Sequence, residues 1–591
     1  MGGFHGKCLR IDLTTEEFSV TTLDKDVLYS YLGGRGIGAY IFNKEVYSDF
    51  EPLNEKAPIV LSVGPLTGTK IPTSGRSSMT FKSPLTGLIN DSNAGGKFGT
   101  SLKACGFDTV VIQGRSKKLM LLNITPLGVE FIPAENLKQK TTDETHNYLQ
   151  KKLGVTCSTA CIGPAGENGV LYASVAVDGH RNFGRGGGGA VWGSKNIKAI
   201  AVKGNIPTSI YDKEKYDFFH YEMEKQLLAN PITSKALPEF GTAVLVNVMN
   251  SQGILPSKNF QENFSLDALN ISGEELTDRY LHKKSACQHC PIACGRVVKI
   301  DSKIGAGPEY ETIYALGAMC GIYDLEAIIK ANLLCNALGL DTISTGVTIA
   351  CAMEMHEKGY LSDKIKFGDI NTQYELIKDI ALRKGIGNEL AKGSKKFAAL
   401  YEHPEFAMQV KGLELPAYDP RGSQSQGLAY ATSNRGGCHL RANMTSPEIL
   451  GIPKMIDRDA VHGKAGLLIV MQHTSAIFDS LVLCKFAGYA IGDEFLARIL
   501  TAVSGIDFEP MHLQIIGERI WNTERIVNLK FGLNPEREDT LPNRLLKEFT
   551  KDGPSAGKVV NLTPMLEEYY RFRSWTIDGI PTQAKLDELG L

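Results

Sequence analysis

Three closely spaced cysteines constrain the fold of this chain more than any other feature. They stand in the segment Cys287-Gln-His-Cys290-Pro-Ile-Ala-Cys294. Thiolates at this spacing can surround one soft metal centre, which makes this segment a candidate metal site. Three clustered cysteines plus one remote cysteine are typical of an iron–sulfur cluster. A zinc site more often uses two separate ligand pairs, although His289 lies inside the motif and is a candidate zinc ligand.

The spacing does not identify the fourth ligand, and unligated thiols are a third reading of the motif. Four remote cysteines are eligible: Cys320, Cys335, Cys438 and Cys484. The N-terminus has no basic segment followed by an apolar one, which predicts a cytoplasmic protein without an export signal. The 12 cysteines of this chain are therefore not expected to form a disulfide framework.

The charge balance excludes two classes of partner. The formal net charge is −1, so no strong field is present to attract nucleic acid or anionic lipid. The longest apolar stretch, about 465–486, is interrupted by Gln472, His473, Asp479 and Lys485. It predicts a buried helix and no membrane span.

The chain divides into a β-rich and a helical part, which predicts an α+β fold. Glycine is concentrated in the first 205 residues, where backbone must turn tightly or approach another group. Apolar runs there predict strands at 8–13, 18–23, 58–63, 109–113, 119–124 and 199–202. After residue 206 the apolar spacing predicts helices at 216–228, 325–340, 345–358, 374–400 and 495–504. We expect three domains: a β-rich domain at 1–205 and two mostly helical domains at 206–410 and 411–591.

Several short motifs occur in an order that is specific in combination, although each is weak alone. In chain order they are Gly6-Lys-Cys-Leu-Arg-Ile-Asp-Leu13, Leu32-Gly-Gly-Arg-Gly-Ile-Gly38, Gly64-Pro-Leu-Thr-Gly-Thr69, Ser74-Gly-Arg76, Lys82-Ser-Pro-Leu-Thr-Gly87, Asp91-Ser-Asn93-Ala-Gly-Gly96, Gly193-Ser-Lys-Asn-Ile-Lys-Ala199, the cysteine triplet and Gly307-Pro-Glu-Tyr-Glu-Thr312. With these motifs the chain resembles the tungsten-containing aldehyde:ferredoxin oxidoreductase family over nearly its whole length.

The resemblance implies a tungsten centre held by two pyranopterins, with molybdenum as an alternative metal, beside a [4Fe–4S] cluster. The two N-terminal sheets would form a base for the pterin cofactor. Cys287, Cys290, Cys294 and Cys484 would bind the cluster. In the segment from Asp479 through Leu483 to Cys484, the aspartate would accept a hydrogen bond from one pterin. A sister segment, from Asn336 to Asp341, would hold the second pterin, with Asn where the family often has Asp.

The resemblance also implies a Mg²⁺ ion that bridges the pterin phosphates. Asn93 and the backbone of Phe183 would bind it, as Mg²⁺ usually takes few protein ligands besides cofactor oxygens. Phe183 departs from the small residue common in the family. Backbone at Gly95 and in the loop Asn182-Phe-Gly184-Arg185 would approach the phosphates, and Arg76 would bridge the cluster and a pterin.

For catalysis the resemblance implies a general base, Glu311. Tyr310 would donate a hydrogen bond to the substrate or to an oxo ligand, and His439 would donate to the carbonyl oxygen of the substrate. Electrons would pass through the cluster to ferredoxin or to a partner iron–sulfur subunit, and a homodimer or a larger complex are both open. The bridging iron of some family members needs a Glu-x-x-His pair, whereas this chain reads Glu326-Ala-Ile-Ile at that helix. Two alternatives stand beside aldehyde oxidation: a related tungsten enzyme that reduces an aromatic thioester, and a non-enzymatic iron–sulfur or zinc-binding protein.

Overall fold

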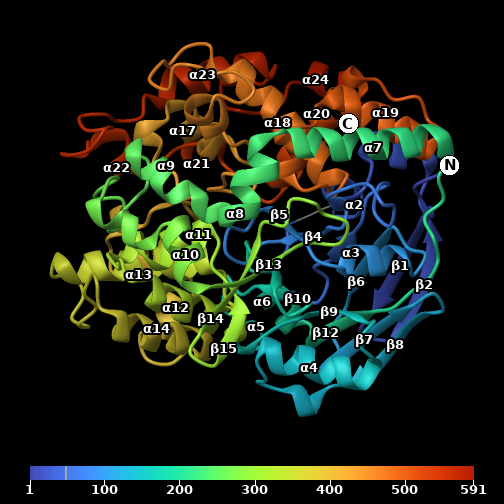
Figure 1. Cartoon of the computed structure of the whole chain (residues 1–591), viewed down its shortest axis with the longest axis horizontal. Coiled ribbons are helices and arrows are strands. Elements are labelled where there is room, and N and C mark those ends of the chain that lie inside the picture. The colour runs from blue at the N-terminus through green and yellow to red at the C-terminus, as the bar shows by residue number, and fades with distance from the viewer. Residues whose placement is uncertain (47–48) are drawn as a thin grey trace.

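The computed structural model describes residues 1–46 and 49–591 (Figure 1). The first part of the chain forms a six-stranded sheet in the order β2-β1-β6-β3-β4-β5. Its strands are β1 (Lys7–Asp12), β2 (Glu17–Thr22), β3 (Ile59–Ser62), β4 (Ser77–Lys82), β5 (Ile89–Ala94) and β6 (Thr109–Gln113). β1 and β2 form the predicted hairpin, with Leu9 opposite Val20.

A second six-stranded sheet has the order β11-β10-β9-β12-β7-β8. Its strands are β7 (Met120–Thr125), β8 (Gly128–Pro133), β9 (Ser158–Cys161), β10 (Val175–Val177), β11 (Arg181–Phe183) and β12 (Ile197–Val202). Apolar side chains of both sheets, such as Val110 and Ile200, share one buried core. The two sheets therefore pack against each other and present their remaining edges and loops to the rest of the chain.

A glycine-rich helix, α2 (Gly34–Glu45), packs against β4 and against α20 (Pro510–Lys530). The sequence had indicated only a β-rich region here. A Cβ atom at Gly38 would lie 2.0 Å from Oγ1 of Thr80, so glycine is what permits this close approach.

The chain after residue 206 is mostly helical (Figure 1), and it supplies most of the largest apolar core among the described residues. The longer helices are α7 (Lys213–Ala229), α10 (Gly273–Tyr280), α11 (Tyr310–Leu316), α12 (Leu325–Leu338), α13 (Thr342–Glu357), α14 (Ile370–Leu382), α17 (Gln424–Thr432), α18 (Lys464–Ser480), α19 (Asp493–Ser504), α20 and α23 (Leu562–Phe572). The predicted α+β class, with two N-terminal sheets followed by mostly helical parts, is confirmed. The domain boundaries near 205 and 410 stay predictions.

Two expectations for the helical part are wrong. The predicted helix at 374–400 is three helices, α14, α15 (Gly387–Leu390) and α16 (Ser394–Leu400), because Gly385 and Gly393 take left-handed backbone angles between them. The helical part also contains a three-stranded antiparallel sheet of β13 (Leu281–Ser285), β14 (Gly295–Ile300) and β15 (Lys303–Ala306). The cysteine triplet occupies the loop between β13 and β14.

A buried ion network ties α20 to the segment after it. Arg525 Nη2 lies 2.6 Å from Asp539 Oδ2, and Lys411 Nζ lies 2.8 Å from Oδ1 of the same carboxylate. All three side chains are fully buried, so each charge depends on its partners. Among the described residues, no single helix is long and apolar enough to cross a membrane; one sharply bent pair, Tyr310–Cys320 with Leu325–Leu338, reaches that apolar length only jointly.

Candidate functional site

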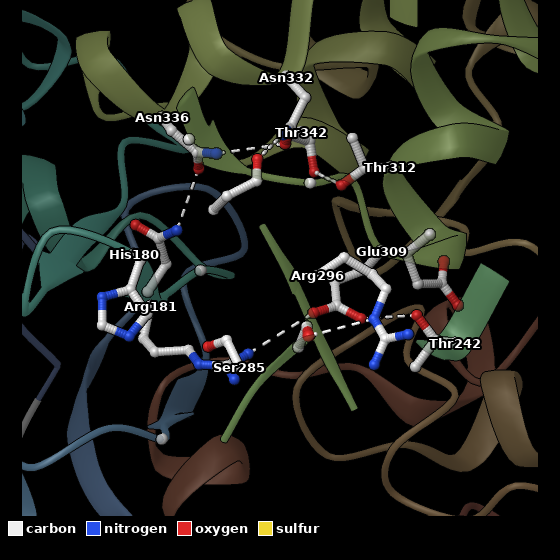
Figure 2. A pocket seen from close by; sticks show the side chains of 18 of the residues that line it. His180, Arg181, Thr242, Ser285, Arg296, Glu309, Thr312, Asn332, Asn336 and Thr342 are labelled. Carbon is white, nitrogen blue, oxygen red and sulfur yellow. Dashed lines mark hydrogen bonds and ion pairs between the residues drawn. The ribbon is translucent and has the colours of Figure 1, made fainter. Parts of the chain in front are cut away.

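One cavity of about 1620 Å³ draws its walls from remote parts of the chain. Figure 2 shows side chains that line it. Most of the predicted site residues are on its wall: Arg76, Gly95, Asn182, Gly184, Arg185, Cys287, Cys290, Cys294, Tyr310, Glu311, Asn336, Asp341, His439 and Cys484. Four are not: Asn93, Phe183, Asp479 and Leu483. The fold thus gathers at one place side chains that the sequence separates by hundreds of residues.

The four predicted cluster ligands differ from every other cysteine in their exposure. Cys287, Cys290, Cys294 and Cys484 are partly exposed, whereas the other eight are buried. Cys484 follows α18 and is held by its backbone N–H, which donates to the carbonyl oxygen of Thr73 at 3.1 Å. The four thiols therefore line one wall of the cavity close to the molecular surface.

The environment of these thiols makes their ionisation costly without a cation. Burial, followed by the nearby Cys484 and Cys287, raises the pKa of Cys290 to about 12. Burial is also the main cause that raises the pKa of Cys294 and of Cys484. A positive metal centre among them would reverse this penalty. No three His, Cys, Asp or Glu side chains in the described part of the chain lie close enough to hold a single metal ion.

Arg76 and Gly95 adjoin the cysteines from the N-terminal part of the chain. Arg76 Nε donates to Oδ1 of Asn93 at 2.5 Å, and Nη2 donates to the Asn93 carbonyl oxygen at 2.9 Å. A Cβ atom at Gly95 would lie 2.6 Å from Sγ of Cys287 and 3.3 Å from Nη1 of Arg76. Gly95 therefore leaves the space that Cys287 occupies, and Arg76 lies beside it.

The loop that was predicted to approach phosphates meets the predicted second pterin segment. Asn182 Nδ2 donates to Oδ1 of Asn336 at 3.1 Å, and Asn336 Nδ2 donates to Oδ1 of Asn332 at 3.2 Å (Figure 2). β11, which ends at Phe183, packs against β5, which carries Asn93. The Phe183 side chain itself points into the core, edge-on to Phe98.

Several polar atoms of residues on this cavity wall, and one of Asn93 beside the wall residue Arg76, are buried without a hydrogen-bond partner. They include Nδ2 of Asn93, Oδ1 of Asn182, and Nε and Nη2 of Arg181. An unpaired buried polar group typically costs about 1–3 kcal/mol. Their presence together indicates that this wall is built to contact a polar group that the protein chain does not supply.

The two predicted pterin-binding aspartates are already engaged with protein groups. Asp341 caps α13 through the backbone N–H groups of Ile343 and Ser344 and lies 3.3 Å from Nε of Arg185. Asp479 lies behind the cavity wall, 2.7 Å from Arg441 and 3.0 Å from Lys485.

Asp479 is ionised in this setting. Burial alone would raise its pKa, but Lys485, Arg441 and Arg35 outweigh burial and lower the pKa to about 2. Leu483 packs in the apolar core beside it. The predicted pterin contacts of Asp479 and Leu483 stay predictions, since neither side chain reaches the cavity wall.

Glu311 and His439 lie side by side at the cavity wall. Nε2 of His439 lies 3.3 Å from Oε1 of Glu311, although this contact lacks hydrogen-bond geometry and leaves Oε1 without a partner. Burial, the largest cause, raises the pKa of Glu311 to about 8. Burial, followed by Arg185 and Arg435, lowers the pKa of His439 well below its ordinary value. At neutral pH the pair is therefore a carboxylic acid and a neutral imidazole, and not an ion pair.

Tyr310 is linked to Glu311 through the backbone of Ala417. Its hydroxyl donates to the carbonyl oxygen of Ala417 at 2.8 Å, and the N–H of the same residue donates to Oε2 of Glu311 at 3.0 Å. Because a phenol has one O–H, Tyr310 has none free for a substrate in this arrangement. The predicted hydrogen bond from Tyr310 to a substrate or oxo ligand stays a prediction; in this structure Tyr310 and Ala417 together orient Glu311.

Sequence reasoning missed two groups of basic side chains. Arg181 lines the cavity, lies 3.6 Å from Glu309 and adjoins the cysteine loop, since a Cβ at Gly295 would lie 2.7 Å from Nη2 of Arg181. A second group, Arg35, Arg435 and Arg441, is buried behind His439. Arg35 pairs with Glu524, and Arg441 pairs with Asp91 and Asp479. Arg435 instead donates to the backbone carbonyl oxygen of Asp91. Only the flanking of His439 by two arginines in the sequence pointed to this group.

Within the second group, Cys438 accepts from Arg435 at 2.9 Å and from the backbone N–H of Leu440 at 3.2 Å. Burial raises its pKa, but Arg435 and Arg441 outweigh burial, so the net shift is downward. The residue that precedes His439 is thus fixed by cationic and backbone donors.

Known families and proteins match this chain over nearly its whole length. The family model "Aldehyde ferredoxin oxidoreductase, N-terminal domain" matches residues 8–204, and the model of domains 2 and 3 matches residues 219–591. The chain is 44% identical to the tungsten-containing aldehyde ferredoxin oxidoreductase of Pyrococcus furiosus, with 100% of this chain and 99% of that protein covered. The corresponding protein of Thermococcus kodakarensis is 45% identical with the same coverage.

More distant relatives have other names. An aliphatic sulfonate oxidoreductase, WOR-like subunit, of Pyrococcus furiosus is 30% identical over 100% of this chain and 97% of that protein. The active-site complex BamBC of benzoyl-coenzyme A reductase shares the fold, with a TM-score of 0.87 at 23% identity over 100% of this chain and 97% of that one. This chain belongs to the aldehyde ferredoxin oxidoreductase family.

Proposed function

We propose that this protein oxidises an aldehyde to the carboxylic acid at a tungsten centre bound by two pyranopterins. Two electrons leave through a [4Fe–4S] cluster to ferredoxin or to a partner iron–sulfur subunit. One observation carries the proposal: a single cavity joins the four partly exposed thiols to the Glu311–His439 pair. The relatives that match this chain from end to end are named tungsten-containing aldehyde ferredoxin oxidoreductases.

The residues of the cavity fit the groups that this proposal needs. The cluster would take its four thiolates from Cys287, Cys290, Cys294 and Cys484. The thiolate ligands of a [4Fe–4S] cluster lie further from one another than the ligands of a single zinc ion. The unpartnered N–H groups of Asn93 and Arg181 suit the phosphate oxygens of a pterin cofactor, and the unpartnered Oδ1 of Asn182 suits its Mg²⁺ ion. When bound, the tungsten centre accepts the two electrons of the oxidation. No side chain is proposed as a tungsten ligand, so molybdenum is the alternative metal.

The reaction adds one oxygen from water to the aldehyde and releases two protons and two electrons. Glu311 is the proposed proton acceptor, at Oε1, because that atom is unpartnered and faces the cavity. Its raised pKa of about 8 makes the ionised form a strong enough base near neutral pH.

His439 is the proposed partner of the substrate oxygen. It is neutral and its Nδ1 lacks a protein partner, so its N–H can be directed at the aldehyde oxygen by the choice of tautomer. Tyr310 positions Glu311 through Ala417. We further propose a cytoplasmic location, with a homodimer or a larger complex as alternative assemblies.

Metal analysis of anaerobically purified protein, followed by an aldehyde-dependent viologen reduction assay, tests the proposal. Tungsten with about four irons per chain, and viologen reduction that depends on aldehyde, are the expected results. Zinc as the only metal would reject the proposal in favour of a zinc-binding protein. Reduction of an aromatic thioester without aldehyde oxidation would favour the second tungsten chemistry.

A further inference from the structure

The small sheet that carries the cysteine triplet is strongly basic. Residues 281–306 contain five Lys or Arg side chains and one Asp, whereas the whole chain has a formal net charge of −1. Lys283 and Lys284 on β13 and Lys299 on β14 are exposed. The positive charge is therefore a local property of this sheet, and part of it faces solvent.

Exposed cationic groups adjoin the cysteine loop from two sides. On one side, β13 ends two residues before Cys287, and at about 3.3 Å per residue the Lys284 Cα lies within roughly 10 Å of the Cys287 Cα. On the other side, exposed Lys97 follows Gly96, whose carbonyl oxygen accepts from the Gln288 N–H at 3.5 Å.

Thr100 anchors the same loop by donating to Oε1 of Gln288 at 2.5 Å. Exposed His289 lies within the loop, and exposed His282 precedes Lys283. We name this set the basic collar: Lys97, His282, Lys283, Lys284 and His289.

Nearby carboxylates of the described residues form no ion pair with the lysines of the collar. Glu309 pairs with Arg181 and accepts from the hydroxyl of Thr242 (Figure 2). Asp178 accepts from the hydroxyl of Ser158 and from backbone N–H groups, that of Lys97 included. In the part of the chain that the structure describes, the lysines of the collar form no ion pair. Their charge is therefore available to a partner.

We propose that the basic collar is the docking surface for a small acidic iron–sulfur protein that takes one electron at a time. This inference rests on the proposed function and specifies where its electrons leave. The four thiols are the only partly exposed cysteines among the described residues, so a cluster there lies near the surface that the collar surrounds. Complementary charge steers such encounters and raises their association rates by about 10 to 10³. Interfaces of electron-transfer pairs are small, which suits a surface of a few side chains.

The double variant Lys283→Glu/Lys284→Glu tests the proposal. The matched control is Lys117→Glu/Lys118→Glu, an adjacent exposed pair on the β6–β7 loop. The assay follows aldehyde-dependent reduction of an acidic 2[4Fe–4S] ferredoxin at low ionic strength, and then of benzyl viologen.

We expect kcat/KM for ferredoxin to fall at least tenfold in the test variant and less than twofold in the control. The difference should disappear at about 0.5 M salt, where screening shortens the Debye length to a few ångströms. Lys283→Gln/Lys284→Gln should give an intermediate loss, and Lys97→Glu a several-fold loss. Lys283 and Lys284 also line the cavity, but both side chains are exposed, so iron content, the viologen rate and the KM for aldehyde should stay within twofold of wild type.

Three results would overturn the proposal: an unchanged ferredoxin kcat/KM, an equal loss in the control, or a raised KM for aldehyde, which would assign the lysines to the substrate. If the wild type does not reduce viologen with any aldehyde, the proposed function fails instead. Calorimetric binding of oxidised ferredoxin then still decides the docking proposal, because the same tenfold rise in Kd is required of Lys283→Glu/Lys284→Glu.

Discussion

Replacing Glu311 by glutamine tests the proposed base, because the carboxylate has one unpartnered oxygen facing the cavity and a pKa of about 8. At pH 7 roughly one tenth of Glu311 is ionised, so kcat of the wild type should rise about tenfold per pH unit up to pH 8 and then level off. Loss of a general base typically costs about 10² to 10⁴ in rate. We expect Glu311→Gln to lose at least a hundredfold in kcat, to show no rise toward pH 8 and to keep its metals.

The same variant has a second, independent readout in stability. The folded-state pKa of Glu311 is raised from 4.5 to about 8, so its contribution to stability is fully present below pH 4.5 and is lost as pH rises through 8. The loss amounts to a ceiling of about 5 kcal/mol, because one pKa unit is about 1.4 kcal/mol. Glutamine cannot ionise and escapes this loss. Between pH 5 and 9 the apparent Tm of the variant should therefore rise relative to that of the wild type, by at most about 4 °C for a chain of this size.

Viologen assays and thermal scans from pH 6 to 9 measure both effects. The control is the neighbouring variant Glu309→Gln, whose kcat should fall less than tenfold because the Glu309 side chain is 45% exposed. A Glu311→Gln variant that keeps more than a tenth of the wild-type kcat would refute the reasoning. A wild-type profile that is flat between pH 6 and 9 would refute it as well.

Three further predictions follow from packing and charge. Gly95→Ala should displace Cys287, whose Sγ lies 2.6 Å from the added Cβ, and should lower the iron content severalfold while the circular dichroism spectrum stays normal. In the control, Gly492→Ala, the added Cβ meets nothing within 4 Å, so this variant should keep its full iron content. Equal iron content in the two variants would contradict the prediction. Cys484→Ser should remove most of the iron and the electron paramagnetic resonance signal of the reduced cluster. Cys351→Ser, at a buried cysteine that does not line the cavity, should retain both. Asp539→Asn should destabilise the fold by about 3–5 kcal/mol, since it leaves Arg525 and Lys411 buried without their counter-ion. Thermal scans compare this variant with the surface control Glu494→Gln, and equal Tm values for the two variants would contradict the prediction.

Local patterns in the sequence predicted six of the 17 strands in the described residues and several of the longer helices, since such patterns depend on neighbouring residues. The strand expected at 58–63 is β3 (Ile59–Ser62), and the helix expected at 495–504 is α19 (Asp493–Ser504). The sheet β13–β15 was missed because its strands carry exposed lysines and lack a clear apolar alternation. The helix α2 was missed because its glycines are explained only by the close approach of β4.

Long-range features of the site were predictable only in part. The cysteine spacing indicated a metal centre, and the structure brings Cys484 to the same cavity as the triplet. The buried arginines behind His439 were not predictable, because their burial depends on carboxylates from α2's neighbour β5 and from α20, such as Asp91 and Glu524. Nor could the sequence show that the O–H of Tyr310 is already used by Ala417.

The origin of the four thiols in separate parts of the chain has a consequence for biosynthesis. Cys294 and Cys484 lie far apart along the sequence but on one cavity wall. At ordinary rates of translation the ribosome needs roughly 10 to 40 s to travel from one codon to the other. During that interval the nascent chain contains the cysteine triplet but not yet Cys484, the fourth proposed ligand. Iron loading should therefore be a late, post-translational event, performed on a chain whose C-terminal helices have already docked.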